Sequence, residues 1–231
     1  MRAQDFKAQR LNHAWGQVEA ARRLGVSQPY LALLEKGERR LTPELARRAA
    51  LVYGLPPTEL PVRANFTPTK EVGPQQLVEY LSRLDYPGFA YVRTHVRTKN
   101  PEEVLLTALA QGSLEARVAE ALPWLLLRYW RTDHRWLVAL AKKFDLQNRL
   151  GFVVSLARRL SEASLETERT NALSHLEATL HHSRLAREDF FFRPPRNSVE
   201  RQWLVENRPE EANQWNLLSD LQPEHLQYAQ Y

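Results

Sequence analysis

The sequence predicts an all-α fold in which a small basic N-terminal domain is joined to a larger helical-bundle domain. Three observations carry this prediction. Residues 16–40 have the sequence GQVEAARRLGVSQPYLALLEKGERR, which indicates two short amphipathic segments joined by a glycine turn. Most of the chain beyond residue 75 repeats apolar side chains at helical spacing. A proline-rich stretch over residues 56–74 separates the two parts.

The positive charge of the chain is unevenly distributed. The 231 residues carry a formal net charge of +5. Residues 1–63 contain 11 Lys and Arg against 6 Asp and Glu, whereas residues 64–231 contain 21 of each, so the whole excess lies in the first part. A basic small domain attached to a neutral larger one is typical of a protein that binds nucleic-acid phosphates.

The composition also excludes several classes of protein. The chain has no cysteine, which excludes disulfides and thiolate metal sites and predicts a reducing compartment. No N-terminal apolar segment resembles a signal peptide, and no run of about 18 apolar residues could span a bilayer. We therefore expect a cytoplasmic protein without a membrane partner.

Local signals define the helices of the N-terminal domain. The first amphipathic segment covers residues 17–24, and Gly25 supplies the permissive residue that the following turn requires. Ser27 is suited to cap the next helix, and Gly37 ends it. Thr42, followed by a proline, is a strong start for a further helix.

Residues from about 6 to 60 resemble the five-helix DNA-binding domain of Cro-like, phage-repressor-type regulators of the XRE family. The resemblance implies the fold of that domain, with a short fifth helix near residues 57–60. Several spaced positions agree over more than thirty residues, and the matching residues are Gln17, Leu24-Gly25-Val26-Ser27, Leu34-Glu35-x-Gly37, Thr42-Pro43-Glu44-Leu45 and Tyr53-Gly54.

The resemblance implies that a homodimer binds double-stranded DNA, with the third helix in the major groove. It implies that Gln17 donates to a phosphate, and that Gln28 reads a base because its amide can pair bidentately with adenine. Ala32 or Leu33 would contact a thymine methyl. The other residues that would face the groove or clamp phosphates are Ser27, Pro29, Tyr30, Lys36, Arg39 and Arg40.

Two residues depart from the family pattern. Leu33 stands where the family usually places a polar or basic residue, and Pro29 removes a backbone donor. Specificity could therefore rest on DNA shape and phosphate geometry. The alternative for Tyr30 and Leu33 is packing against the second helix or a neighbouring subunit, and the alternative for the whole segment is a helix-turn-helix used only for protein contacts.

Domain boundaries are expected where proline and glycine interrupt the helical pattern. The predicted parts are a helix-turn-helix domain over residues 1–62, a linker over 63–74, a helical domain over 75–187 that senses, dimerises or binds a partner, and an aromatic-rich tail with short helices over 188–231. Within the helical domain, Asn100 and Asp133 precede apolar-periodic segments as caps do.

The exception to the helical pattern is GFAYVRTHVRTK at residues 88–99, which predicts a short strand or hairpin. In an extended chain its basic residues share one face. One interpretation is a basic arm that touches nucleic acid or an acidic partner, and the other is a solvated edge strand whose charges discourage aggregation. The basic residues are Arg93, His95, Arg97 and Lys99.

The tail also has two interpretations. Its aromatic residues either anchor a partner protein or fold back and bury themselves against the helical domain. They include Phe190, Phe191, Phe192, Trp203, Trp215 and Tyr228.

Catalytic, cofactor and metal sites are not predicted. The HExxH, GxSxG and phosphate-loop motifs are missing. His175 and His182 would lie two turns apart on one helix, about 10 Å, which is too far to share one ion. We therefore expect neither an enzyme nor a metalloprotein.

The sequence thus predicts a sequence-specific DNA-binding regulator that represses its own operon. The alternative is an antitoxin that neutralises a partner toxin through the C-terminal domain and tail. This second interpretation rests on a general similarity to helix-turn-helix antitoxins encoded beside nucleotidyltransferase-like toxins, carried by the segments LARRAALVYGLPPTELPV, ALPWLLLRYW and LQNRLGFVVSLARRL. The two functions are compatible, since an antitoxin can also repress its own operon.

Overall fold

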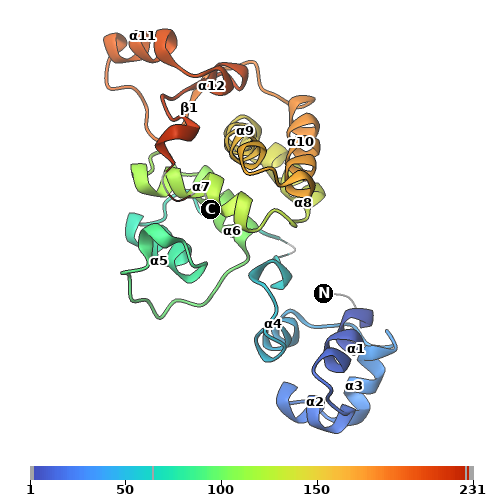
Figure 1. Cartoon of the computed structure of the whole chain (residues 1–231). Coiled ribbons are helices and arrows are strands. Elements are labelled where there is room, and N and C mark those ends of the chain that lie inside the picture. Colours follow the sequence, from blue (N-terminus) through green and yellow to red (C-terminus); the bar gives the residue numbers. More distant parts are fainter. Residues whose placement is uncertain (1–2, 64, 227, 229–231) are drawn as a thin grey trace. The chain divides into compact units, whose positions relative to one another are not determined.

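The computed structural model describes residues 3–63, 65–226 and 228, and Figure 1 shows its secondary structure. Nearly all the regular structure is helical, which confirms the predicted all-α class. The chain forms two compact units, Met1–Asn65 and Phe66–Tyr231, and each is described by itself below.

Over its described residues, 3–63 and 65, the N-terminal unit contains four α-helices and one short 3-10 helix. The predicted fifth helix is therefore a single 3-10 turn, where Pro56 and Pro57 restrict the backbone. The elements are α1 (Ala3–Asn12), α2 (Gln17–Leu24), α3 (Gln28–Glu35), α4 (Pro43–Val52) and η1 (Pro57–Glu59).

The predicted caps and turn of this unit are confirmed. Gly25 adopts a left-handed conformation with φ 65°, and its N–H bonds to carbonyls of the last turn of α2. The Ser27 hydroxyl accepts a hydrogen bond from the N–H of Tyr30 at 3.3 Å. The Thr42 hydroxyl accepts one from the N–H of Leu45 at 3.2 Å. These bonds satisfy amides that a helix start leaves unpaired.

The apolar faces of these helices form a small core. The ring of Phe6 meets that of Tyr53 edge-on, with centroids 6.1 Å apart. The buried residues of this core are Phe6, Ala20, Ala21, Leu24, Leu31, Leu34, Leu45, Ala49 and Tyr53.

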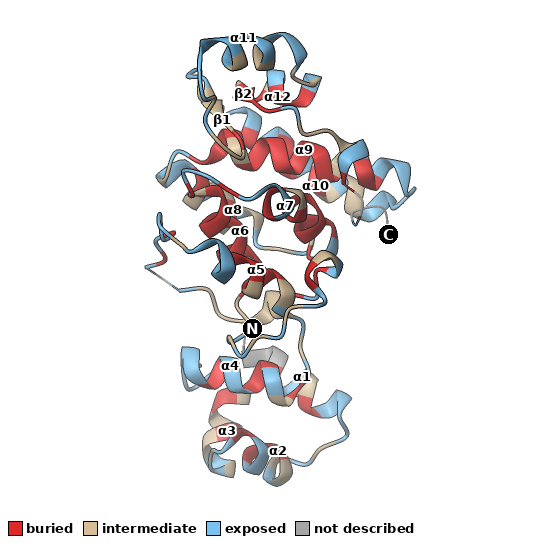
Figure 2. Cartoon of the chain, turned by 90° about the vertical axis from the view of Figure 1, so that its left-hand side faces the viewer, coloured by how far each residue is buried: buried red, intermediate tan, exposed pale blue. Residues whose placement is uncertain are grey.

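The larger unit is built around helix α9 (Gln147–Ala163), which packs against α10 (Thr167–His181) and α7 (Ala116–Arg128). Figure 2 shows buried residues along most of α9, and twelve of its seventeen residues are buried. The other elements before the tail are α5 (Pro74–Arg83), η2 (Pro87–Phe89), α6 (Pro101–Leu109) and α8 (His134–Lys143).

Part of the segment expected to act as a linker packs onto this unit. Phe66 is buried, and its ring lies 5.7 Å from that of Trp136. The Gln111 side chain donates to the carbonyl of Thr69 at 2.7 Å and accepts from the N–H of Val72 at 3.0 Å. Residues 66–73 are therefore fixed to the helical domain.

The tail folds back on the same unit through short elements. Its strands β1 (Asp189–Phe190) and β2 (Leu217–Leu218) pair in parallel, with Asp189 opposite Leu217. The remaining elements are α11 (Ser198–Asn207), α12 (Glu210–Gln214) and η3 (Pro223–His225). Phe191 and Trp215 are buried, as expected if the tail covers its own rings, whereas Trp203 is half exposed.

The expected strand or hairpin at residues 88–99 is absent. The segment begins in η2 and then runs from residue 92 to residue 100 without helix, turn, bend or strand pairing. The predicted alternation of side chains between two faces is confirmed, because Val92 and Val96 pack against the core while Arg93 is exposed. The error was to expect a partner strand, which alternation within one segment cannot specify.

Within the described ranges, none of the helices is long and apolar enough to cross a bilayer.

Candidate nucleic-acid interface

The two helices of the helix-turn-helix begin with glutamines whose side chains meet. Gln17 is the first residue of α2 and Gln28 the first residue of α3. The Gln28 amide donates a hydrogen bond to Gln17 Oε1 at 2.8 Å. Because residues 25–27 reverse the chain, two residues eleven positions apart lie side by side.

A buried ion pair holds Gln17 in turn. The Gln17 amide donates to Glu35 Oε2 at 3.0 Å. Glu35 also accepts two hydrogen bonds from the Arg10 guanidinium, from Nε at 2.6 Å and from Nη2 at 3.0 Å. Burial opposes ionisation of Glu35, but the hydrogen bonds from Arg10 and Gln17 outweigh it and hold the pKa of this carboxyl below its usual value.

These contacts form one chain of hydrogen bonds, which we call the Gln28 relay: Arg10, Glu35, Gln17 and Gln28. The relay fixes which way the Gln28 amide points, because its nitrogen must face Gln17 Oε1. The second N–H and the Oε1 of Gln28 then remain for a base, and those are the two groups that pair with adenine. Sequence reasoning missed Arg10 and Glu35 as supports, since their pairing joins residues 25 positions apart.

The turn between α2 and α3 is tightly packed as well as left-handed. Arg48 of α4 donates to the carbonyl of Leu24 at 3.0 Å and so satisfies the end of α2. A Cβ at Gly25 would lie 2.5 Å from Arg48 Nη1. Only glycine meets both demands without strain or displacement of Arg48.

Some of the other predicted contact residues are exposed and others are half-buried. Ser27 and Pro29 are exposed at the start of α3, and Ala32 and Leu33 are half-buried. Tyr30 is half-buried and packs against the core of the unit, as its alternative interpretation expected. The basic residues after α3 are Lys36, Arg39 and Arg40, and all three are exposed without an ion pair to any described residue.

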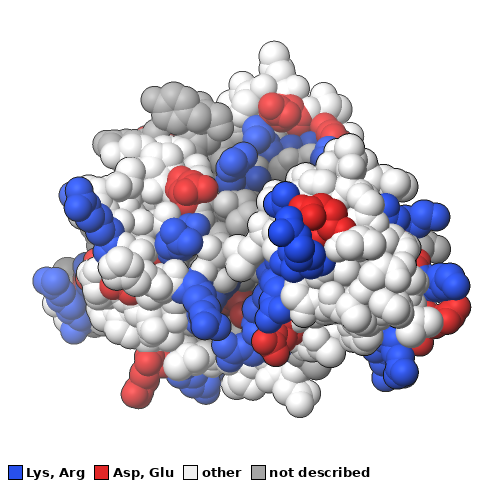
Figure 3. Space-filling model, turned by 90° about the horizontal axis from the view of Figure 1, so that it is seen from below, with Lys and Arg blue, Asp and Glu red and all other residues white. Residues whose placement is uncertain are grey.

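Positive charge elsewhere on the unit is partly balanced. Arg22 and Arg23 of α2 both bond to Glu19. Figure 3, which draws side chains of both units, shows Lys and Arg interspersed with Asp and Glu. The unpaired cations after α3 therefore remain candidates for phosphate contacts.

The predicted basic arm belongs to the larger unit. Arg93, His95 and Arg97 are exposed, whereas the Lys99 ammonium lies 3.9 Å from the ring centroid of Tyr80. Lys99 is thus engaged with the helical domain. No three His, Asp or Glu side chains within the described ranges are grouped so that they could hold a metal ion.

Comparison with known proteins identifies the N-terminal unit. Residues 6–60 match a family model described as helix-turn-helix, and this match covers α1 from Phe6 through the end of η1. No curated protein and no solved structure gave a significant match to the chain. The N-terminal unit is therefore a helix-turn-helix domain of the XRE family, a DNA-binding domain of transcription regulators.

Proposed function

We propose that this protein is a sequence-specific transcription regulator that represses its own operon. The observation that carries the proposal is the Gln28 relay, because it presents a fixed amide at the start of the recognition helix. A base-reading group whose orientation is set before binding loses less conformational entropy when it binds, and a chain of hydrogen bonds that ends in a buried ion pair sets that orientation.

A homodimer is the expected binding species. One recognition helix with a single fixed amide contacts only a few base pairs, whereas two copies double the contacts across a palindrome. The half-sites would then lie about 10 base pairs apart, one turn of DNA. Repression follows when such a dimer occupies DNA upstream of its own gene and blocks access to the promoter.

The test is fluorescence anisotropy with the DNA upstream of the gene across a salt series, with scrambled DNA of the same length as control. We expect salt-sensitive binding that favours the upstream DNA by about 10³-fold or more. Equal weak affinity for both DNAs would contradict autorepression.

The antitoxin function remains a second candidate, favoured by one observation on the tail. Helix α11 has no buried residue, and it exposes Val199 and Trp203 one turn apart, with relative exposures of 76% and 50%. Helix α11 contacts β2, and a partner protein that covers its exposed face would stabilise it further by burying these two side chains. Co-expression with the product of the adjacent gene tests this: co-purification that Trp203→Ala abolishes would support it, and separate elution would not.

A further inference from the structure

Residues 92–99 pair with no strand in the described part of the chain, and Figure 1 draws the segment before α6 as a plain trace. Burial alternates from residue 92 to residue 98. Arg93, His95 and Arg97 are exposed, and the residues between them are half-buried. The segment therefore has the side-chain alternation of a strand held by one face to the helical domain.

The backbone hydrogen bonds of this segment within the described part of the chain all belong to even-numbered residues. In an extended chain, the N–H and C=O of alternate residues point to opposite edges. The carbonyl of Val92 accepts from the Ser82 hydroxyl at 3.1 Å, and the N–H of Val96 bonds to Thr94 Oγ1 at 3.2 Å. Val92 is thus bonded to α5 through Ser82, whereas the bond of Val96 lies within the segment. Among the described residues, the backbone groups of Arg93, His95 and Arg97 have no hydrogen-bond partner.

The charges of the exposed face are also unpaired. Arg93 and Arg97 form no ion pair with any carboxylate in the described part of the chain. Residues i and i+2 of a strand lie about 6.6 Å apart. Arg93, His95 and Arg97 therefore match the spacing of alternate side chains on a neighbouring strand. The segment thus offers an unpaired strand edge flanked by positive charge.

We propose that residues 93–97 bind an extended acidic segment of a partner protein by strand addition. The partner would supply backbone donors and acceptors to the free edge, with Asp or Glu at alternate positions opposite Arg93, His95 and Arg97. Nucleic acid fits less well. A phosphate accepts hydrogen bonds but donates none, so the free carbonyls along the same edge would stay unsatisfied and repel it.

The experiment uses the full chain and a fluorescein-labelled peptide, Glu-Val-Glu-Thr-Glu-Val-Glu, measured by fluorescence anisotropy. We expect it to bind more tightly than a peptide of the same composition in the order Val-Val-Thr-Glu-Glu-Glu-Glu. The double variant Arg93→Ser, Arg97→Ser should weaken binding by roughly 3- to 30-fold, because two cross-strand charge pairs are lost.

The matched control is Arg135→Ser, Lys142→Ser, which removes two exposed charges from α8 of the same unit. We expect its affinity for the alternating peptide to stay within about twofold of the unchanged protein, since distant exposed charges are screened. Equal loss in both double variants, or equal binding of both peptides, would mean simple charge attraction and would overturn the proposal.

Protection of backbone amides from hydrogen exchange distinguishes strand addition from simple charge attraction, which forms no backbone hydrogen bonds. On saturation with the alternating peptide, the amides of Arg93, His95 and Arg97 should become protected, while that of Thr98 should not. If no peptide binds and the Arg93→Ser, Arg97→Ser variant instead loses affinity for random duplex DNA, the segment is a nucleic-acid arm and strand addition is wrong.

Discussion

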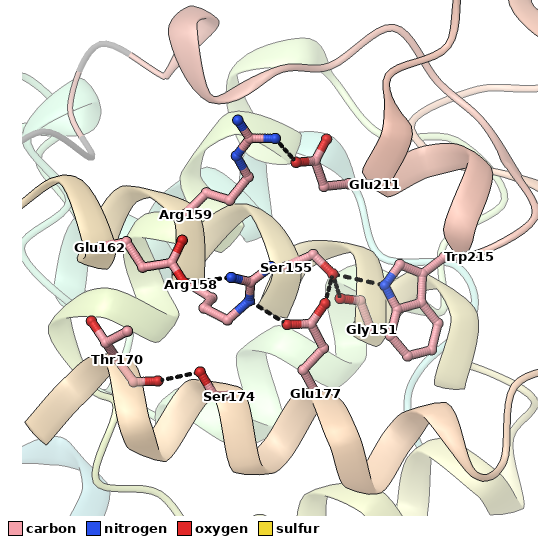
Figure 4. Close-up of polar contacts among 10 residues, drawn as sticks. All are labelled: Gly151, Ser155, Arg158, Arg159, Glu162, Thr170, Ser174, Glu177, Glu211 and Trp215. Atoms are coloured by element: carbon pink, nitrogen blue, oxygen red, sulfur yellow. Dashed lines mark hydrogen bonds and ion pairs between the residues drawn. The ribbon is translucent and has the colours of Figure 1, made fainter. Parts of the chain in front are cut away.

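The indole ring of Trp215 lies against Gly151 in the N-terminal part of α9, so close that a Cβ on Gly151 would be 2.4 Å from ring atoms. Figure 4 shows the surrounding polar contacts. Trp215 Nε1 donates to Ser155 Oγ at 2.7 Å, and Ser155 lies 2.6 Å from Glu177 Oε1 of α10. Arg158 Nε completes the group by donating to Glu177 at 2.5 Å. The tail is thus anchored at the junction of the two longest helices.

Replacing Gly151 with Ala should destabilise the larger unit by roughly 1–3 kcal/mol. The added methyl forces out the Trp215 ring and breaks its bond to Ser155. Urea unfolding of the full chain measures the change. Gly112→Ala is the control, since a Cβ there meets nothing within 4 Å. Equal stability of the two variants would show that Trp215 does not depend on this close approach.

Glu102 should make the stability of the larger unit depend on pH. It is 3% exposed, its Oε1 accepts from the N–H of Asp133 at 2.6 Å, and its Oε2 has no hydrogen-bond partner among the described residues. Burial raises its pKa to about 7, and the nearby Asp133 and Glu103 carboxylates act in the same direction against the Asp133 N–H bond.

Glu102 therefore binds its proton more tightly in the native protein than in the unfolded protein, where the pKa of its carboxyl is near 4.5. The resulting stability is complete below pH 4.5 and is lost as pH rises through about 7, by up to about 3 kcal/mol. Urea unfolding from pH 4 to pH 8 should show this fall, and Glu102→Gln should flatten it. Glu115→Gln, an exposed site, should leave the curve unchanged. Parallel curves for Glu102→Gln and the unchanged protein would refute the assignment.

Replacing Glu35 with Gln should destabilise the N-terminal unit by roughly 3–5 kcal/mol, because it leaves the Arg10 charge buried without its partner. The two side chains are 9% (Arg10) and 4% (Glu35) exposed. Thermal unfolding followed by circular dichroism measures the shift. Glu19→Gln, which removes exposed ion pairs on α2, should barely move the midpoint. Similar shifts of the unfolding midpoint for the two variants would mean that the Arg10–Glu35 pair contributes no more to stability than an exposed ion pair.

Replacing Gln28 with Ala should cost roughly 1–3 kcal/mol of binding at the cognate site and little on random DNA. Gln17→Ala should reduce the same preference less, because Gln17 supports the Gln28 amide and does not read a base itself. Anisotropy with both DNAs measures the difference, and Gln75→Ala, exposed in the other unit, is the control. Equal losses on both DNAs would mean that Gln28 does not read a base.

Replacing Arg39 and Arg40 together with Ala should weaken all DNA binding and reduce the slope of log affinity against log salt by about 2. The reason is the loss of two phosphate contacts and their released counterions. The double variant Arg135→Ser, Lys142→Ser removes two exposed charges from the other unit and should keep the slope. An unchanged salt slope in the Arg39→Ala, Arg40→Ala variant would mean that neither residue contacts a phosphate.

Local sequence determined the helix-turn-helix. Gly25, Ser27 and Thr42 act on backbone groups within a few residues, so their chemistry specifies the turn and the two caps before any tertiary contact forms. The apolar periodicity likewise determined that the rest of the chain is helical. Each of these signals is complete within one turn or one helix face.

Only the tertiary structure decided what those faces meet. The Gln28 relay depends on Arg10 and Glu35, and the buried Glu102 depends on the amide of Asp133 from another helix. Periodicity predicts that a face is buried but says nothing about its partner, because contacts between distant residues depend on how the whole chain packs. For the same reason, alternation at residues 92–99 predicted an extended segment, whereas the lack of a neighbouring strand became visible only in the fold.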